Sequence, residues 1–120
     1  MLFNIDTGKE VKRDPHLNEY NLWRSRLTNA EFEAIVEKLN SLIDSDEIHT
    51  ASWMPGNNWD GTVFEPIYTK ACNNDETLSG MCFGLFVWYV FKERDDEWYH
   101  GKFENNGIPI KGMTYFRKKY

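Results

Sequence analysis

The sequence MCFGLFVWYVFK, residues 81–92, is the most apolar stretch of the chain and decides which fold the rest can build. It contains a single glycine and carries no charge before its final lysine. When its residues are sorted alternately, as they would point on a strand, both sets are apolar. That pattern is typical of a strand covered on both faces. We therefore expect residues 81–92 to form a central strand of a sheet.

Further strands are predicted on both sides of this stretch. Residues 97–104 and 108–117 are joined by Asn-Asn-Gly at 105–107, a favourable hairpin turn. Together with the apolar stretch they predict a three-stranded antiparallel meander. Upstream, residues 2–5 and 47–54 have the composition of short strands, so one or two N-terminal strands would join the sheet.

Helices are predicted between the N-terminal strands and before the apolar stretch. Residues 15–27 have a rough helical periodicity. Thr28 and Glu31 have capping-box spacing at the start of a clearly amphipathic helix, and a third helix is expected within residues 62–74. The chain is therefore predicted to be one α+β domain, residues 1–120, with two to three helices packed on one face of an antiparallel sheet.

Few helices are available to cover a sheet whose central strand is apolar on both sides. The second face would have to bury against the N-terminal segment, a ligand or another copy of the chain. Closed twofold dimers are the commonest oligomers. We therefore expect a homodimer.

Composition and charge indicate a globular domain and disfavour a nucleic-acid partner. The 120 residues are 41% hydrophobic and include 5 Trp, 6 Tyr and 8 Phe, which is typical of a globular, aromatic-rich domain. The net charge is −5, and residues 41–76 carry one lysine against seven carboxylates. Such an acidic segment would repel a phosphate backbone, so a nucleic-acid partner is disfavoured.

The cellular setting is predicted from the apolar runs and the cysteines. The longest apolar run is well below the roughly 18 residues that a membrane span needs, so no membrane role is expected. The first residues lack the pattern of a signal peptide, which predicts a cytoplasmic protein. Cys72 and Cys82 are then expected to be reduced, inert thiols, although one bridge between them stays possible.

The segment between Trp53 and Glu65 is the best candidate binding site. Two indoles six residues apart are accompanied by carboxamides and a carboxylate, in a stretch dense in turn-forming residues. Indole faces stack on sugars, bases or cations, and the polar groups can orient a ligand. The predicted ligand-binding residues are Trp53, Asn57, Asn58, Trp59, Asp60 and Glu65. The competing interpretation is that both indoles cover the edge of the core.

Catalysis and metal binding receive little support from the sequence. His16, His49 and His100 have no metal-ligand spacing with one another or with a cysteine, so neither a metal nor another cofactor is expected. Asp60 and Glu65 could act as an acid/base pair of a small hydrolase, but both have simpler local roles in a turn and a cap. Whether the protein is an enzyme is left open, with binding favoured.

Taken as a whole, this short chain rich in Trp and Tyr resembles the small accessory proteins carried on bacterial integron gene cassettes. The resemblance implies a soluble, often oligomeric protein of unassigned adaptive function, and it transfers no site. The predicted function is binding of a small polar or cationic ligand, or a peptide, at the Trp53–Trp59 loop. A protein–protein accessory module without a small ligand is the main alternative, and a small hydrolase is the next.

Overall fold

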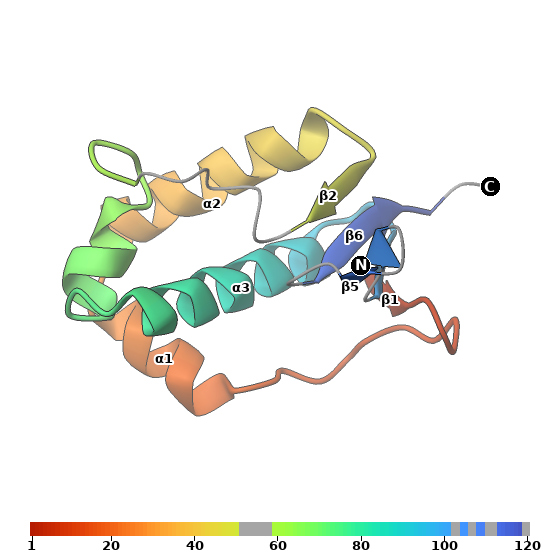
Figure 1. Cartoon of the computed structure of the whole chain (residues 1–120), viewed down its shortest axis with the longest axis horizontal. Coiled ribbons are helices and arrows are strands. Elements are labelled where there is room, and N and C mark those ends of the chain that lie inside the picture. Colours follow the sequence, from red (N-terminus) through yellow and green to blue (C-terminus); the bar gives the residue numbers. More distant parts are fainter. Residues whose placement is uncertain (51–58, 102–103, 106–107, 110–112, 119–120) are drawn as a thin grey trace.

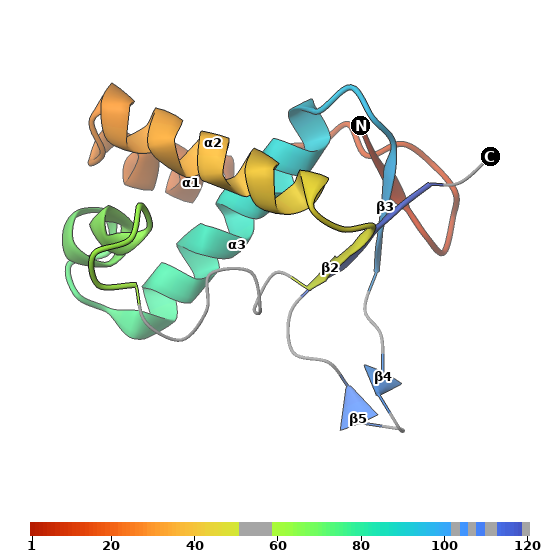
Figure 2. The ribbon, with the colours of Figure 1, turned by 90° about the horizontal axis from the view of Figure 1, so that it is seen from above.

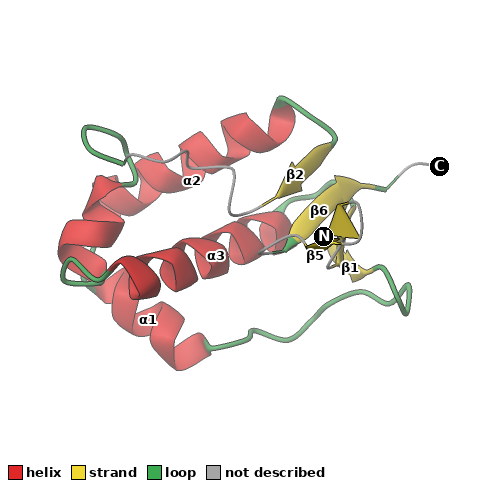
Figure 3. Ribbon diagram, in the orientation of Figure 1, coloured by secondary structure: helices red, strands yellow, loops and turns green. Residues whose placement is uncertain are grey.

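The computed structural model describes residues 1–50, 59–101, 104–105, 108–109 and 113–118, and it is an α+β fold. Helices occupy one side of the molecule and the strands the other (Figures 1 and 3). In chain order the elements are β1 (Leu2–Asn4), α1 (Leu17–Ser25), α2 (Asn29–Asp44), β2 (Ile48–Thr50), the π-helix η2 (Ile67–Ala71), α3 (Glu76–Glu93), β3 (Trp98–Gly101), β4 (Glu104–Asn105), β5 (Ile108–Pro109) and β6 (Thr114–Arg117).

The apolar stretch 81–92 is helical, so the prediction of a central strand there was wrong. It lies within α3, whose first turn is capped by Asp75, because the side-chain Oδ1 accepts a hydrogen bond from the backbone N of Leu78 at 2.9 Å. Glu76 in the first turn and Lys92 in the last complement the helix dipole. A helix that is apolar nearly all round is expected to be largely buried. Most of the length of α3 is buried, although Met81 near its start is 54% exposed.

Three other helices and the sheet surround α3. It contacts α1, α2 and η2. Figure 1 shows it between α1 and α2, and Figure 2 shows its C-terminal end reaching the strands. Its fully buried residues are Cys82, Val87 and Phe91, each 0% exposed. The prediction of a dimer was based on a two-sided strand that this stretch does not form, so the dimer stays a prediction.

The main sheet has four strands in the order β1-β3-β6-β2 and is mixed, not purely antiparallel as predicted. Strand β1 pairs with β3 in parallel, with Leu2 opposite Trp98, whereas β6 pairs antiparallel with both β3 and β2. The predicted strand at 2–5 is present as β1, and the one at 47–54 is present in part as β2, since residues 51–54 lie outside the described residues. A separate two-stranded ribbon, β4–β5, contains the predicted hairpin.

The inner face of the sheet packs on the C-terminal half of α3. The ring of Phe91 stacks on Tyr115 at 4.1 Å between centroids and meets Trp98 edge-on at 4.9 Å. Leu2 is fully buried beside them. Phe91 therefore joins the helical and the sheet halves in one core.

The remaining helices follow the sequence pattern to different degrees. Helix α2 begins with the predicted capping box, in which Thr28 and Glu31 exchange hydrogen bonds between side chain and backbone. Helix α1 lies within the predicted 15–27. The predicted helix in 62–74 is only a short π-helix.

None of the helices within the described ranges is long and apolar enough to cross a membrane.

Candidate functional site

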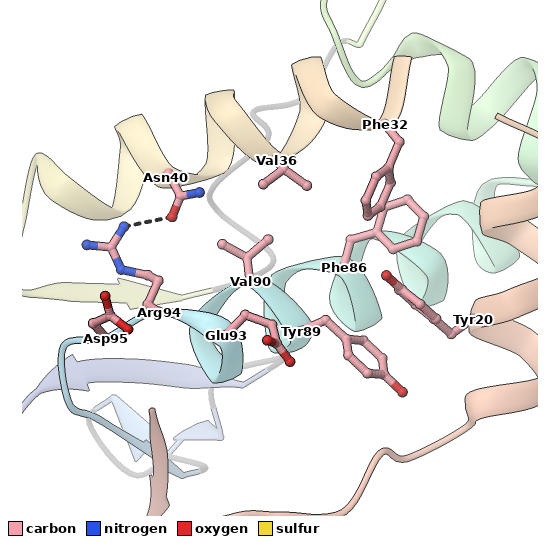
Figure 4. Close-up of a pocket in the computed structure, with 10 residues that line it drawn as sticks. All are labelled: Tyr20, Phe32, Val36, Asn40, Phe86, Tyr89, Val90, Glu93, Arg94 and Asp95. Carbon is pink, nitrogen blue, oxygen red and sulfur yellow. Dashed lines mark hydrogen bonds between the residues drawn. The ribbon is translucent and has the colours of Figure 1, made fainter. Parts of the chain in front are cut away.

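A cavity of about 450 Å³ lies between α1, α2 and α3, and we call it the interhelical groove. Its volume is within the roughly 300–1,000 Å³ that small-molecule sites usually have. Figure 4 shows its walls, which come from all three helices and from the segment that follows α3. The lining residues are Tyr20, Phe32, Val36, Asn40, Phe86, Tyr89, Val90, Glu93, Arg94 and Asp95.

Helical spacing explains why these side chains share one groove. On α2 the lining residues Phe32, Val36 and Asn40 are four apart, and residues at this spacing lie on one face of a helix. On α3, Phe86 and Val90 repeat the same spacing. Two stripes that start with an aromatic ring and end in a polar group therefore face each other, which gives the groove an aromatic end and a polar end (Figure 4).

The aromatic end is built from edge-to-face ring contacts. Phe32 and Tyr20 each meet Phe86 with ring centroids 5.6 Å apart and nearly perpendicular planes. Tyr20 also lies against Tyr89, at 4.0 Å between centroids. Such contacts fix ring positions, so this end is a preformed apolar wall.

The polar end is organised by Arg94. Its Nη1 donates to Oδ1 of Asn40 at 2.8 Å, Nη2 donates to Asp44 at 2.5 Å, and both Nε and Nη2 donate to the carboxylate of Asp96 at 2.9 Å. A guanidinium held in this forked way is rigid. Arg94 therefore ties α2 to the end of α3 and closes one end of the groove.

These contacts fix the charge states at the polar end. Hydrogen bonds from Arg94 lower the pKa of Asp96 to about 2, despite the opposing effect of partial burial. The hydrogen bonds to Asp96 in turn raise the pKa of Arg94 above its ordinary value. Both groups stay charged across the physiological pH range.

The two tyrosines of the groove keep neutral phenols. Burial is the main cause that raises the pKa of Tyr20 and that of Tyr89. The hydroxyl of Tyr89 donates to the backbone oxygen of Pro15 at 3.3 Å, which anchors the segment before α1. The groove therefore offers neutral, polarisable rings at neutral pH.

The described part of the predicted Trp loop has local roles. Trp59 is half-buried and its ring packs against Phe64 and Phe83, with centroids 6.3 and 5.7 Å away. Glu65 Oε2 accepts a hydrogen bond from the backbone N of Gly61 at 2.8 Å. Asp60 is exposed in the same turn. Trp59 thus covers the edge of the core, and the carboxylate of Glu65 stabilises the turn.

Three of the predicted loop residues, Trp53, Asn57 and Asn58, lie outside the described residues. The loop site therefore stays a prediction. None of its described members lines the interhelical groove.

The histidines and cysteines are separate from the groove. Cys72 and Cys82 are both buried, and burial raises the pKa of both thiols. The Nε2 of His49 lies within 3.1 Å of the backbone oxygens of Ile43 and Asp46. His100 is a buried residue of strand β3. Over the described ranges, no group of three metal-ligating side chains comes together.

The groove was missed because of the wrong prediction for residues 81–92. On a strand, Phe86 and Val90 share a face with Trp88, and nothing relates them to the helix that begins at Thr28. A helical interpretation would have placed Phe86, Val90 and Glu93 on one stripe, opposite Phe32 and Val36. The signals for it were the length of the apolar run and the capping residue Asp75.

Comparisons with protein-family models, with curated proteins and with solved structures find no match to this chain, so the resemblance to integron cassette proteins stays a prediction.

Proposed function

We propose that the protein binds a small organic molecule in the interhelical groove. The observation that carries the proposal is a 450 Å³ cavity with an aromatic wall at one end and ordered polar groups at the other. An apolar body would gain contact with Phe32 and Phe86, and polar groups would be oriented near Asn40. We further place the protein in the cytoplasm, without a nucleic-acid partner, on the grounds of its sequence.

Binding is favoured over catalysis because of what lines the groove. The ten lining residues include no histidine, cysteine or serine, so no nucleophile–base pair of the usual kind faces the cavity. At the alternative acid/base site in the loop, the carboxylate of Glu65 is engaged with Gly61. We therefore favour a groove that holds a molecule over one that carries out a reaction.

The proposal is tested by blocking the groove. Compounds with an aromatic or aliphatic body are first screened by thermal shift. A ligand present at a hundred times its dissociation constant would stabilise the fold by about 2.7 kcal/mol, which raises the melting temperature by several degrees. Val36 is half-buried in the wall, so Val36→Phe places a ring in the cavity. We expect this variant to remain folded and to lose the shift.

Ser41→Phe is the matched control, because it adds the same ring on an exposed position of α2. It should keep the ligand-induced shift. A shift of unchanged size in Val36→Phe would place the binding site elsewhere and contradict the proposal.

The second candidate function is a protein–protein module that pairs with its own copy. It is supported by an apolar row on the outer face of the sheet, where the register aligns Phe3, Tyr99, Phe116 and Ile48 across all four strands. Ile48 at the end of this row is 64% exposed. Light scattering should then give a dimer that Ile48→Glu dissociates and that Leu22→Glu, on exposed α1 surface, leaves intact. A monomer at high concentration would exclude self-association.

A further inference from the structure

The two ends of the interhelical groove differ in charge. At the polar end, Glu93 and Asp95 line the cavity and are exposed. Neither carboxylate forms an ion pair with another residue in the described part of the chain. The neighbouring Lys92 is paired with Asp14 and does not offset them. This end therefore carries negative charge without a matched partner.

Arg94 does not reverse this sign, because its charge is already compensated. It pairs with Asp44 and Asp96, and Arg117 also contacts Asp96 at 3.3 Å. The Met1 ammonium donates to backbone oxygens at the end of α3. The positive groups at this end are Arg94, Arg117 and the Met1 ammonium, and the negative ones are Asp44, Glu93, Asp95 and Asp96. The balance is negative by one charge.

The aromatic end carries a positive group instead. The guanidinium carbon of Arg24 lies over the ring of Phe32, 4.1 Å from its centroid. Arg24 is held there by hydrogen bonds to the backbone oxygen of Leu27 and to Asn29. Arg24 would repel a positively charged group of a ligand from this end. The potential along the groove therefore orients a cation with its charge toward Glu93.

Building on the proposed function, we propose that the ligand of the groove is an organic cation, an amine or a quaternary ammonium with an apolar body. The body lies against the contacting rings of Phe32 and Phe86, and the cationic group lies near Glu93 and the ring of Tyr89, four residues earlier on α3. An aromatic face and a carboxylate together attract such a group. Asn40 uses its Oδ1 for Arg94, so only its amide hydrogens remain for a hydrogen-bond acceptor on the ligand.

An anionic ligand is disfavoured by the same contacts. Nε, Nη1 and Nη2 of Arg94 all donate to Asn40, Asp44 or Asp96. These bonds use four of the five N–H donors of Arg94, and a carboxylate that reached the remaining one would also approach Glu93 and Asp95. The groove should therefore bind a cation more tightly than an anion with the same body, and a neutral molecule of the same shape provides the reference affinity.

The experiment compares three probes with the same aromatic body, naphthylethylamine, naphthylethanol and naphthylacetate, by titration calorimetry against the wild-type chain. We expect the amine to bind roughly tenfold more tightly than the alcohol, and the acetate to bind more weakly than both. The preference for the amine should fall as salt is added, because exposed charges are screened. Glu93→Gln should reduce this preference severalfold without changing the affinity for the alcohol.

Glu76→Gln is the matched control, since it removes the same charge from an exposed position at the opposite end of α3. It should keep the full preference for the amine. If amine and alcohol bind equally, or if Glu93→Gln leaves their ratio unchanged, the cation proposal is overturned while the groove remains a binding site. If none of the three probes binds, or if binding persists in Val36→Phe, the proposed function itself fails.

Discussion

The imidazole of His100 is buried in the core below the sheet. It is 8% exposed on the inner side of β3, with its ring centroid 4.7 Å from that of Trp88. Neither ring nitrogen, nor the Nε1 of Trp88, has a partner among the described residues. Burial is the main cause that lowers the pKa of His100; the charge of Asp6 raises it by a smaller amount, and the charge of Arg13 lowers it further. A charged imidazole is therefore costly at this position.

This cost predicts a dependence of stability on pH. Since the folded pKa lies below the unfolded value of about 6.5, the unfolded chain takes up a proton first as the pH falls. The free energy of unfolding should then decrease below about pH 6.5, by no more than about 1.4 kcal/mol per pH unit, until the folded pKa is reached. Urea unfolding of wild type and His100→Phe at pH 8 and pH 5 measures it. Parallel losses in both proteins would contradict the assignment to His100.

A second prediction concerns the capping box of α2. Thr28→Ala removes the acceptor for the backbone N of Glu31, which lies 3.1 Å from the hydroxyl oxygen. We expect a loss of about 1 kcal/mol in the free energy of unfolding. Thr28→Ser keeps the acceptor and should lose much less. Equal losses in the two variants would assign the effect to the methyl group and not to the cap.

At the scale of elements, the sequence predicted the class of fold and most helices and strands, but not the structure of residues 81–92. In α2, polar residues alternate with apolar ones at helical spacing, so the sequence pattern indicates a helix. In α3, the run is apolar at almost every position, and alternation fits it as well as a helical period does. What decides between them is burial by α1, α2 and η2, which is tertiary and invisible in a local pattern.

The helical state of this stretch can be tested at Gly84. It lies in the interior of α3, and a Cβ added there meets nothing within 4 Å. Gly84→Ala should therefore raise the free energy of unfolding by about 0.5–1 kcal/mol, since alanine favours a helix over the unfolded chain.

Gly61 is the control for this substitution, because its φ of +73° is a conformation that alanine rarely adopts. Gly61→Ala should lower stability. Chemical denaturation measures both variants, and destabilisation by Gly84→Ala would argue against an open position on α3.

The interhelical groove was not predicted from the sequence. The sequence drew attention to Trp59, which the structure places on Phe64 and Phe83 at the edge of the core. The groove instead combines Tyr20, Phe32 and Phe86, which come from three helices. No short motif connects residues so far apart in the chain, and their meeting depends on how α1 and α2 pack on α3.

At the scale of the whole molecule, α3 belongs to both the helical and the sheet parts. Phe91 is fully buried between Trp98 and Tyr115. Removing its ring in Phe91→Ala should cost about 3–5 kcal/mol. Because both parts share this core, helical and aromatic circular dichroism signals should melt together in the wild type and shift together in the variant. Two separate transitions would contradict a single domain.

The parallel pairing of β1 with β3 has a consequence for the order of events during synthesis. Leu2 is opposite Trp98, so the first strand leaves the ribosome more than ninety residues ahead of its partner. At roughly 5–20 residues per second, this strand waits several seconds for β3. Helices α1 and α2 can form from local contacts in that interval. The nascent chain is therefore expected to have folded helices while β1 is still unpaired. Hydrogen exchange on stalled ribosomes would detect this state.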